Sequence, residues 1–275
     1  AIPIDFAEEL YAWSSQLKSS KKMLLTLEKK LLELPQGGTA VGSGINAPKQ
    51  FSRYFAQEMT KLLGNKIKCV KSENFYHELS AQDCSVQLSG ELKNLSVILM
   101  KISNDLRWMN SGPLAGLSEI ELKALQPGSS IMPGKVNPVI PEAVAMASAD
   151  VIGNDVTITV AAQSGNFQLN VMLPVIAYNL LKSINLLSGA MSALSKNAIS
   201  SFKVNNKNLE ASLSKNPILV TALNTIIGYE KAAFIAKKAY KENRPIIDVA
   251  AEETDISKTK LSKLLDPSKL AKGGI

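Results

Sequence analysis

The sequence is poor in arginine, histidine, cysteine and aromatic residues. Its 31 basic residues include only three arginines, His77 is the sole histidine, and aromatic residues make up 5% of the chain. A nucleic-acid-binding protein normally concentrates basic side chains with interleaved aromatic residues in one patch. Here the lysines are spread over the faces of expected helices. We therefore interpret the net charge of +7 as a solvated surface and expect no nucleic-acid partner.

Metal ligands are equally scarce. Cys69 and Cys84 are the only cysteines, and they lack the spacing and companion ligands of a zinc site or an iron–sulfur cluster. We therefore expect no metal and no other cofactor. Two thiols without a pairing pattern also indicate a reducing compartment, which favours a cytoplasmic location.

The sequence also shows no long hydrophobic run and no targeting segment. The first residues carry acids and no basic region followed by an apolar run, so we predict neither a signal peptide nor a transit peptide. The most apolar window, Val156–Ala162, follows Asn154 and Asp155 and is too short to cross a bilayer. We expect no membrane partner.

The apolar residues recur instead at helical spacing over long segments. Helices are predicted over about Ile4–Leu34, Pro48–Leu63, Glu78–Arg107, Pro138–Val151 and Ile176–Leu194. Several reach about 25–30 residues, or roughly 40 Å at 1.5 Å per residue. Such helices need partners along their whole length, so we predict an all-α, long-helix bundle. Apolar residues outside the main stripes, such as Val97 and Ile98, are expected to pack between subunits.

The pattern changes after about Phe202, where helical segments become shorter and asparagine and lysine more frequent. Three small helices are predicted over Ile218–Ile227, Lys231–Glu242 and Ile246–Glu253, followed by a short lysine-rich helix. We therefore predict two domains, a central long-helix bundle over residues 1–202 and a small C-terminal helical domain over residues 203–275.

One loop between two long helical segments has an unusual composition, GSSIMPGKVNP at residues 128–138. Gly128 and Gly134 free the backbone, whereas Pro133 and Pro138 restrain it. The loop offers many hydrogen-bond donors and no negative charge, which suits a ligand that bears a carboxylate. We expect it to be mobile until such a ligand binds. By composition alone, an ordinary Gly/Pro-rich helix connector is an equal alternative.

This loop and four further segments resemble the class II fumarase branch of the fumarase/aspartase superfamily. The further segments are Leu34–Asn46, Asn104–Ile120, Gly153–Val171 and Asn216–Ala239. The resemblance implies a hydro-lyase of the tricarboxylic acid cycle that interconverts fumarate and (S)-malate without a metal. It also implies a homotetramer whose active sites are each shared among three subunits, in the cytoplasm or, in a eukaryote, the mitochondrial matrix.

The resemblance assigns roles to five residues. Ser129 matches the catalytic base, and Glu142 matches the acid that partners the family's active-site histidine. The ligands of the substrate carboxylate are matched by Ser130, Lys135 and Asn137. Removing a proton beside a carboxylate places two negative charges on one carboxyl group, so donors must be in position beforehand. Without the resemblance, Ser129 would be interpreted as a loop hydrogen-bonding residue and Glu142 as an exposed helix glutamate.

Two of the three regions that form the family's active site do not occur in this sequence. One contains Ser-Gly-Thr and a later Ser-Ser-Asn, and the other Thr-His followed by an aspartate. His77 lies outside that motif, and we interpret it as an exposed or capping residue. We therefore expect a C-terminal portion of a fumarase that lacks the N-terminal domain and is inactive alone. Two alternatives stay open, an aspartate ammonia-lyase and a non-catalytic helical oligomer scaffold.

Overall fold

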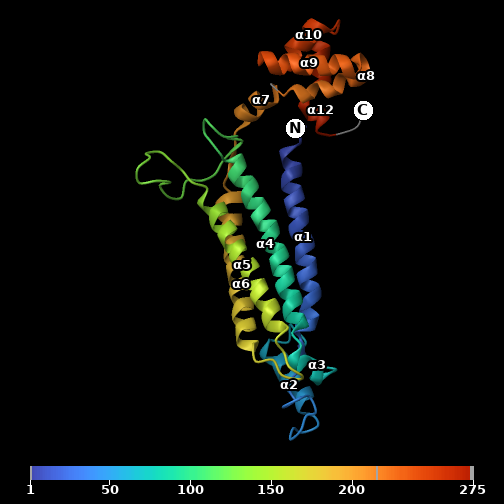
Figure 1. Cartoon of the computed structure of the whole chain (residues 1–275), viewed down its shortest axis with the longest axis vertical. Helices are drawn as coiled ribbons and strands as arrows, with labels where there is room; N and C mark the ends of the chain where they lie inside the picture. Colours follow the sequence, from blue (N-terminus) through green and yellow to red (C-terminus); the bar gives the residue numbers. More distant parts are fainter. Residues whose placement is uncertain (1, 215, 273–275) are drawn as a thin grey trace. The chain divides into compact units, whose positions relative to one another are not determined.

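Helices dominate the computed structural model, which describes residues 2–214 and 216–272 (Figure 1). The prediction of an all-α fold is confirmed. The strands among the described residues are each two residues long: β1 (Glu33–Leu34), β2 (Val70–Lys71), β3 (Ile120–Glu121) and β4 (Lys203–Val204). β1 pairs with β2 in parallel, and β3 pairs with β4 antiparallel.

The chain forms two compact units that are not continuous in sequence. The first contains Ala1–Ser14, Trp108–Leu122 and Phe202–Ile275, and the second contains Ser15–Arg107 and Lys123–Ser201. The predicted domains, 1–202 and 203–275, treated each domain as one uninterrupted stretch. Pairing of β3 with β4 shows why segments distant in sequence group together, because Ile120 lies opposite Val204 in that ladder.

The second unit is built on long helices at the predicted places. Its helices are α2 (Phe51–Leu62), α3 (Phe75–Ser80), α5 (Val139–Ala162) and α6 (Leu173–Leu194), which ends in a π-helical turn, η1 (Ser195–Ile199). It also contains α1 (Phe6–Leu31) from Ser15 onward and α4 (Asp83–Met109) as far as Arg107. The prediction of one continuous helix from Glu78 was wrong. Ala81 has an extended backbone, with φ −72° and ψ 138°, and this residue separates α3 from α4.

Side chains of the long helices join neighbours within this unit. Lys30 on α1 donates to Gln87 on α4 at 3.2 Å. Asn154 on α5 donates to Ser183 on α6 at 3.1 Å. The predicted apolar stripes supply much of the core, including the fully buried side chains of Leu99, Ile102, Leu106, Val144, Val151 and Leu187. Ile158, which lies beyond the predicted segment Pro138–Val151, is also fully buried.

Asp155 of α5 is a buried carboxylate whose side chain is only 7% exposed. Its two oxygens accept from Ser89 Oγ at 2.7 Å and from Lys93 Nζ at 2.6 Å. Ser89 and Lys93 lie one turn apart on α4, so both partners come from the same helix face. Because a buried charge without partners is strongly unfavourable, these contacts favour one register of α5 against α4.

We predict that Lys93→Ala lowers the free energy of unfolding by about 1–3 kcal/mol, because it leaves a buried carboxylate with one partner fewer. The matched control is Lys182→Ala, which removes a 2.8 Å ion pair with Asp150 in which the two side chains are 36% and 43% exposed. That control should cost about 0–1 kcal/mol. Urea unfolding measures both. Equal losses in the two variants would contradict the prediction.

Helix α5 corrects the expectation that no segment is long enough to span a bilayer. It has 24 residues and, by length and composition alone, is long and apolar enough to cross a membrane. A core helix can satisfy the same criterion, and α5 contacts α6 extensively. Met146, Val156 and Val160 are nevertheless exposed on it. They belong to the surface for which packing between subunits is predicted.

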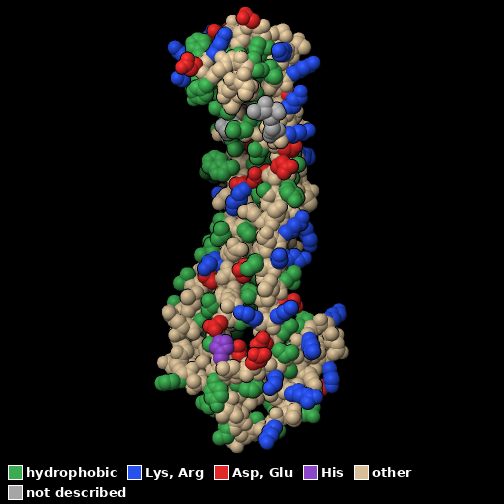
Figure 2. Space-filling view, turned by 90° about the vertical axis from the view of Figure 1, so that its right-hand side faces the viewer, with side chains coloured by type: hydrophobic (Ala, Val, Ile, Leu, Met, Phe, Trp, Pro, Cys, Tyr) green, Lys and Arg blue, Asp and Glu red, His purple; other side chains and the backbone are tan. Residues whose placement is uncertain are grey.

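His77 lies in α3 and contacts the start of α4. Its Nε2 lies 2.9 Å from Asp83 Oδ2, and its Nδ1 lies 3.2 Å from Glu78 Oε1. The hydrogen bond with Asp83 raises the pKa of His77, and the negative charges of Glu78, Asp83 and Glu33 raise it further. Figure 2 shows the histidine beside acidic side chains at the surface. The residue is exposed, as predicted, but the helix cap is Asn74, whose side chain accepts from the His77 N–H.

The raised pKa predicts how stability depends on pH. Protonated His77 is favoured in the folded state, so its contribution is fully present below the unfolded pKa of about 6.5 and is lost as pH rises through the higher folded pKa. The free energy of unfolding should therefore fall less between pH 6 and pH 8.5 for His77→Gln than for the unsubstituted chain. Urea unfolding at the two pH values measures this change. The same pH dependence in both proteins would show that the contacts with Asp83 and Glu78 do not stabilise the fold.

The first unit has its own core of short helices. Its helices are α7 (Asn206–Ser214), η2 (Pro217–Leu223, a 3₁₀ helix), α8 (Asn224–Ile227), α9 (Tyr229–Glu242), α10 (Ile246–Glu253), α11 (Lys258–Leu264) and α12 (Pro267–Leu270). Leu223, Ile235, Val249 and Leu261 are fully buried in this core. The predicted helix over Ile218–Ile227 is thus mostly 3₁₀, and α7 was not predicted.

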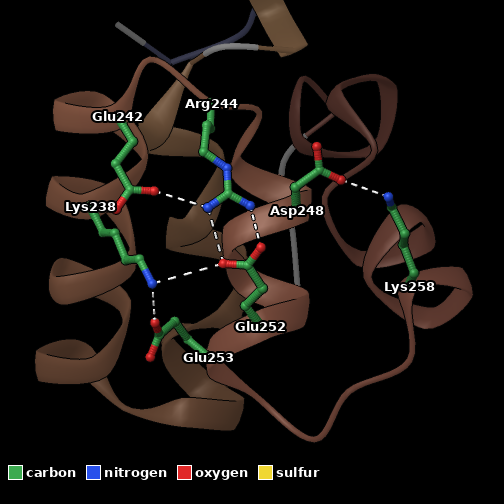
Figure 3. Close-up of polar contacts among 7 residues, drawn as sticks. All are labelled: Lys238, Glu242, Arg244, Asp248, Glu252, Glu253 and Lys258. Carbon is green, nitrogen blue, oxygen red and sulfur yellow. Dashed lines mark hydrogen bonds and ion pairs between the residues drawn. The ribbon is translucent and has the colours of Figure 1, made fainter.

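Ion pairs connect α9 with α10 and α10 with α11 on the surface of this unit (Figure 3). Arg244 contacts Glu242 and Glu252, while Lys238 lies 2.5 Å from Glu253. The hydrogen bond from Arg244 holds the pKa of Glu252 below its ordinary value. Lys258 pairs with Asp248 at 2.6 Å. Because these groups are partly exposed, each pair contributes little stability by itself.

Candidate functional site

The loop at residues 128–137 belongs to the second unit and leads directly into α5 (Figure 1). Pro138 is the residue before the first turn of α5. The loop therefore has a fixed end on a long helix. Most of its side chains are exposed, whereas Ser129 and Asn137 are half-buried.

The centre of the loop is a tight turn over Met132, Pro133, Gly134 and Lys135. The Lys135 N–H donates to the Met132 carbonyl at 3.2 Å. Gly134 has φ +80°, which is the positive value that the third position of a type II turn requires. Proline at the second position of such a turn has its own φ locked near the value that the turn requires. The Pro133–Gly134 pair thus determines the shape of the turn locally.

Ser129 lies beside this turn with two backbone donors directed at its hydroxyl. Ser129 Oγ accepts from the N–H groups of Ile131 and Met132, each at 3.2 Å. Hydrogen bonds donated to an oxygen favour its negatively charged form. The loop therefore provides local stabilisation for a serine alkoxide, which is the form that a serine base requires.

Lys135 supplies positive charge in the pocket that Ser129 also lines. Its side chain is exposed, and no ion pair to it occurs among the described residues. Both residues line a surface pocket of about 450 Å³, together with Leu125, Met132 and Pro133. Small-molecule sites commonly combine apolar walls with a few polar groups in this way. Ser130, the other predicted ligand, is exposed in the same loop.

Asn137 was predicted as a ligand of the substrate carboxylate, but here its side chain bonds to the loop itself. Asn137 Nδ2 donates to the Gly128 carbonyl at 3.0 Å. The Gly128 N–H in turn donates to the Lys135 carbonyl at 2.8 Å. Gly128 therefore uses both its backbone groups to join the two ends of the loop.

Glu142 lies in the first turn of α5, close in sequence to the loop, and is half-buried. Its N–H donates to the Pro138 carbonyl at 3.1 Å. In the part of the chain that the structure describes, no hydrogen bond or ion pair links its carboxylate with Ser129 or Lys135. His77 bonds to carboxylates of its own region. The roles assigned to the five site residues stay predictions.

The sequence interpretation expected backbone N–H donors in this loop, but not which amides contact Ser129 or how the base of the loop closes. Gly128 was credited with freedom only, yet a Cβ there would lie 2.6 Å from the Lys135 carbonyl oxygen. The amides of Ile131 and Met132 carry no side-chain signal. The type II turn was the detectable part, because Pro-Gly after Met132 is a common sequence for that turn.

A metal centre finds no support in the described residues. Over residues 2–214 and 216–272, no group of three or more His, Cys, Asp or Glu side chains could hold a metal ion. Cys69 is buried, Cys84 is half-buried, and both are free thiols. Burial raises the pKa of the Cys84 thiol, and this makes its thiolate less available.

Comparison with known proteins agrees with the motifs. A family model described as "Lyase" matches residues 1–153, and one described as "Fumarase C C-terminus" matches residues 219–272. The chain is 57% identical over 275 residues to "Fumarate hydratase class II 2" of Pseudomonas aeruginosa, covering all of this chain and 60% of that protein.

Two solved structures have the same fold. A class II fumarase of Schistosoma mansoni matches with a TM-score of 0.93 and 32% identity, over 98% of this chain and 59% of that one. A fumarate lyase:delta crystallin of Brucella melitensis, solved bound to cobalt, matches with a TM-score of 0.93 and 39% identity, over 98% and 58%.

The chain therefore belongs to the lyase family, and its similarity to class II fumarate hydratases extends over its whole length. It spans about 60% of the length of the curated relatives that it matches. The resemblance inferred from GSSIMPGKVNP and the four other segments is confirmed.

Proposed function

We propose that the protein to which this chain belongs is a class II fumarate hydratase that interconverts fumarate and (S)-malate. The observation that carries the proposal is the Ser129 hydroxyl, which two backbone N–H groups contact in a pocket that it shares with Lys135. No ion pair to Lys135 occurs among the described residues. Relatives named as fumarate hydratase class II cover the chain from end to end. Both the local chemistry and the family therefore favour proton abstraction beside a carboxylate.

Each group has a distinct part in the proposed reaction. Ser129, as the alkoxide, removes the proton from the carbon next to a carboxylate of malate. The electron pair moves into that carboxyl group, which becomes a doubly charged aci-carboxylate. Lys135 and Ser130 donate hydrogen bonds to this group where its charge increases. Protonation of the departing hydroxide is assigned to a group outside this loop.

We also propose that the active protein is a homotetramer, with sites shared among subunits, in the cytoplasm or a mitochondrial matrix. Support for shared sites comes from the sequence, which carries one of the family's three active-site regions. The exposed apolar side chains of α5 and α6, such as Met146, Val156 and Leu181, supply surface for such an assembly. Free Cys69 and Cys84 fit a reducing compartment.

The proposed activity predicts a difference between the full-length protein and the 275-residue chain. The full-length protein should hydrate fumarate with a turnover on the order of 10 per second. The 275-residue chain should show negligible hydration, because catalytic groups that act as a unit lose most of their activity when one is removed. Absorbance of fumarate follows both reactions.

The same assay distinguishes the alternatives. Deamination of aspartate by the full-length protein, without hydration of fumarate, would support an aspartate ammonia-lyase instead. A folded full-length protein that performs neither reaction would support a helical scaffold. Ordinary turnover by the verified 275-residue chain would contradict the proposal that its missing motifs are needed.

Substitutions in the full-length protein separate the roles of Ser129 and Lys135. Ser129→Ala should lower kcat strongly and leave KM nearly unchanged, because a base acts only in the transition state. Lys135→Ala should lower kcat and raise KM, since its charge binds substrate and transition state alike. Lys123→Ala, which removes an exposed lysine outside the loop, is the matched control and should change neither. Near-normal kcat in Ser129→Ala would show that another group is the base.

A further inference from the structure

We propose that Asn137 is a positioning residue that closes the base of the 128–137 loop and so holds Ser129 and Lys135 in place. The expected effect on catalysis rests on the proposed function. The role of Asn137 in closing the loop rests on the contacts of the loop alone. Asn137 Nδ2 reaches across the loop to the Gly128 carbonyl at 3.0 Å. This amide is thus already occupied within the loop, and this role is distinct from contact with the substrate.

Two contacts form the closed base of the loop. Beside the bond from Asn137, the Gly128 N–H donates to the Lys135 carbonyl at 2.8 Å. Both contacts converge on Gly128, so the first residue of the loop is tied to its last residues. Without them, the ends would be joined only through the chain itself.

Close approach at the base explains why glycine stands at position 128. A Cβ there would lie 2.6 Å from the Lys135 oxygen, 2.8 Å from its carbonyl carbon and 3.0 Å from the Val136 nitrogen. All three are backbone atoms, so no flexible side chain could move aside. Any side chain at this position would separate the two ends of the loop.

The closed base affects the reactive groups because the contacts inside the loop are linked. Met132 donates its N–H to Ser129 Oγ and accepts the Lys135 N–H on its carbonyl. Lys135 also accepts the Gly128 N–H. A continuous series of hydrogen bonds therefore runs from Asn137 through Gly128 and Lys135 to Met132 and Ser129. If the base opened, Ser129 would lose its fixed position relative to Lys135.

The structural test is amide hydrogen exchange of the 275-residue chain at pH 7. Asn137→Asp has nearly the same shape but replaces the donor with a carboxylate that accepts only. We expect the amides of residues 128 and 135 to exchange roughly two- to tenfold faster than in the unsubstituted chain, as for the loss of one hydrogen bond. Gly128→Ala should loosen the same amides by displacing the backbone.

The matched control is Asn166→Asp, because Asn166 also donates its side-chain amide to a nearby carbonyl, that of Ser164, at 3.1 Å. This variant makes the same chemical change in another loop and should leave the exchange of residues 128 and 135 unchanged. Near pH 4, about the pKa of an aspartic acid, protonated Asp can donate again. The ratio of Asn137→Asp to unsubstituted exchange should then fall. Unchanged exchange in Asn137→Asp at pH 7, or equal loosening by Asn166→Asp, would overturn the proposal.

Kinetics of the full-length protein give a second readout. A positioning role predicts that Asn137→Asp and Gly128→Ala both lower kcat, although position 128 has no side chain to contact a substrate. If Asn137 were a substrate ligand alone, Asn137→Asp would raise KM while loop exchange stayed unchanged, which would overturn the proposal. If the unsubstituted full-length protein does not hydrate fumarate, the proposed function fails, while the exchange experiment still decides whether Asn137 closes the loop.

Discussion

The buried carboxylate of Asp155, which pairs with the partly exposed Lys93, fixes the helix on which the candidate site depends. Asp155 lies on α5, and both its partners, Ser89 and Lys93, lie on α4. The loop ends at Asn137, one residue before Pro138 at the start of α5. From there to Asp155 is about 25 Å along the helix at 1.5 Å per residue. A shift of α5 against α4 would therefore displace the loop as well.

Given that anchor, the loop determines its own shape. Gly134 and Pro133 set the type II turn, the amides of Ile131 and Met132 hold the Ser129 hydroxyl, and Gly128 closes the base. These contacts lie within ten residues, so they need neither a ligand nor another subunit. The expectation from the sequence was instead a loop that is mobile until a ligand with a carboxylate binds, and the contacts within the loop argue against that expectation. Our central claim is that the loop is preorganised around Ser129 before any ligand binds.

Most of the helical architecture was predictable because long apolar stripes repeat at helical spacing. The apolar stripe within the predicted helix Glu78–Arg107 correctly indicated α4 but not its start, because the break at Ala81 left no signal, since alanine is itself a strong helix former. The 3₁₀ geometry of η2 depends on i, i+3 hydrogen bonds that periodicity does not distinguish over seven residues. The first unit joins segments that are distant in the sequence through pairs such as Ile120 with Val204, and no local sequence pattern reveals such pairs.

For the site, the sequence predicted candidate residues but not the contacts between them. The resemblance assigned roles to Ser129 and Lys135, which stay predictions, and the composition of the loop favoured an anion-binding role. The bond from Asn137 to Gly128 could not be predicted, because it depends on the path of the backbone between them. For Glu142 the resemblance names a role that the structure of this chain cannot test. Its assigned partner is a histidine in a motif that this sequence does not contain. Its position on α5 alone therefore does not define its chemistry.

Amide exchange at Ile131 and Met132 in the ligand-free chain tests preorganisation most directly. Both N–H groups contact Ser129 Oγ at 3.2 Å. Ser130, which precedes Ile131 in the same loop, is exposed. After correction for intrinsic rates, our account predicts that Ile131 and Met132 exchange more slowly than Ser130. Ser129→Ala should abolish that difference. If all three amides exchange at unprotected rates in the unsubstituted chain, the loop is not preorganised and the account is wrong.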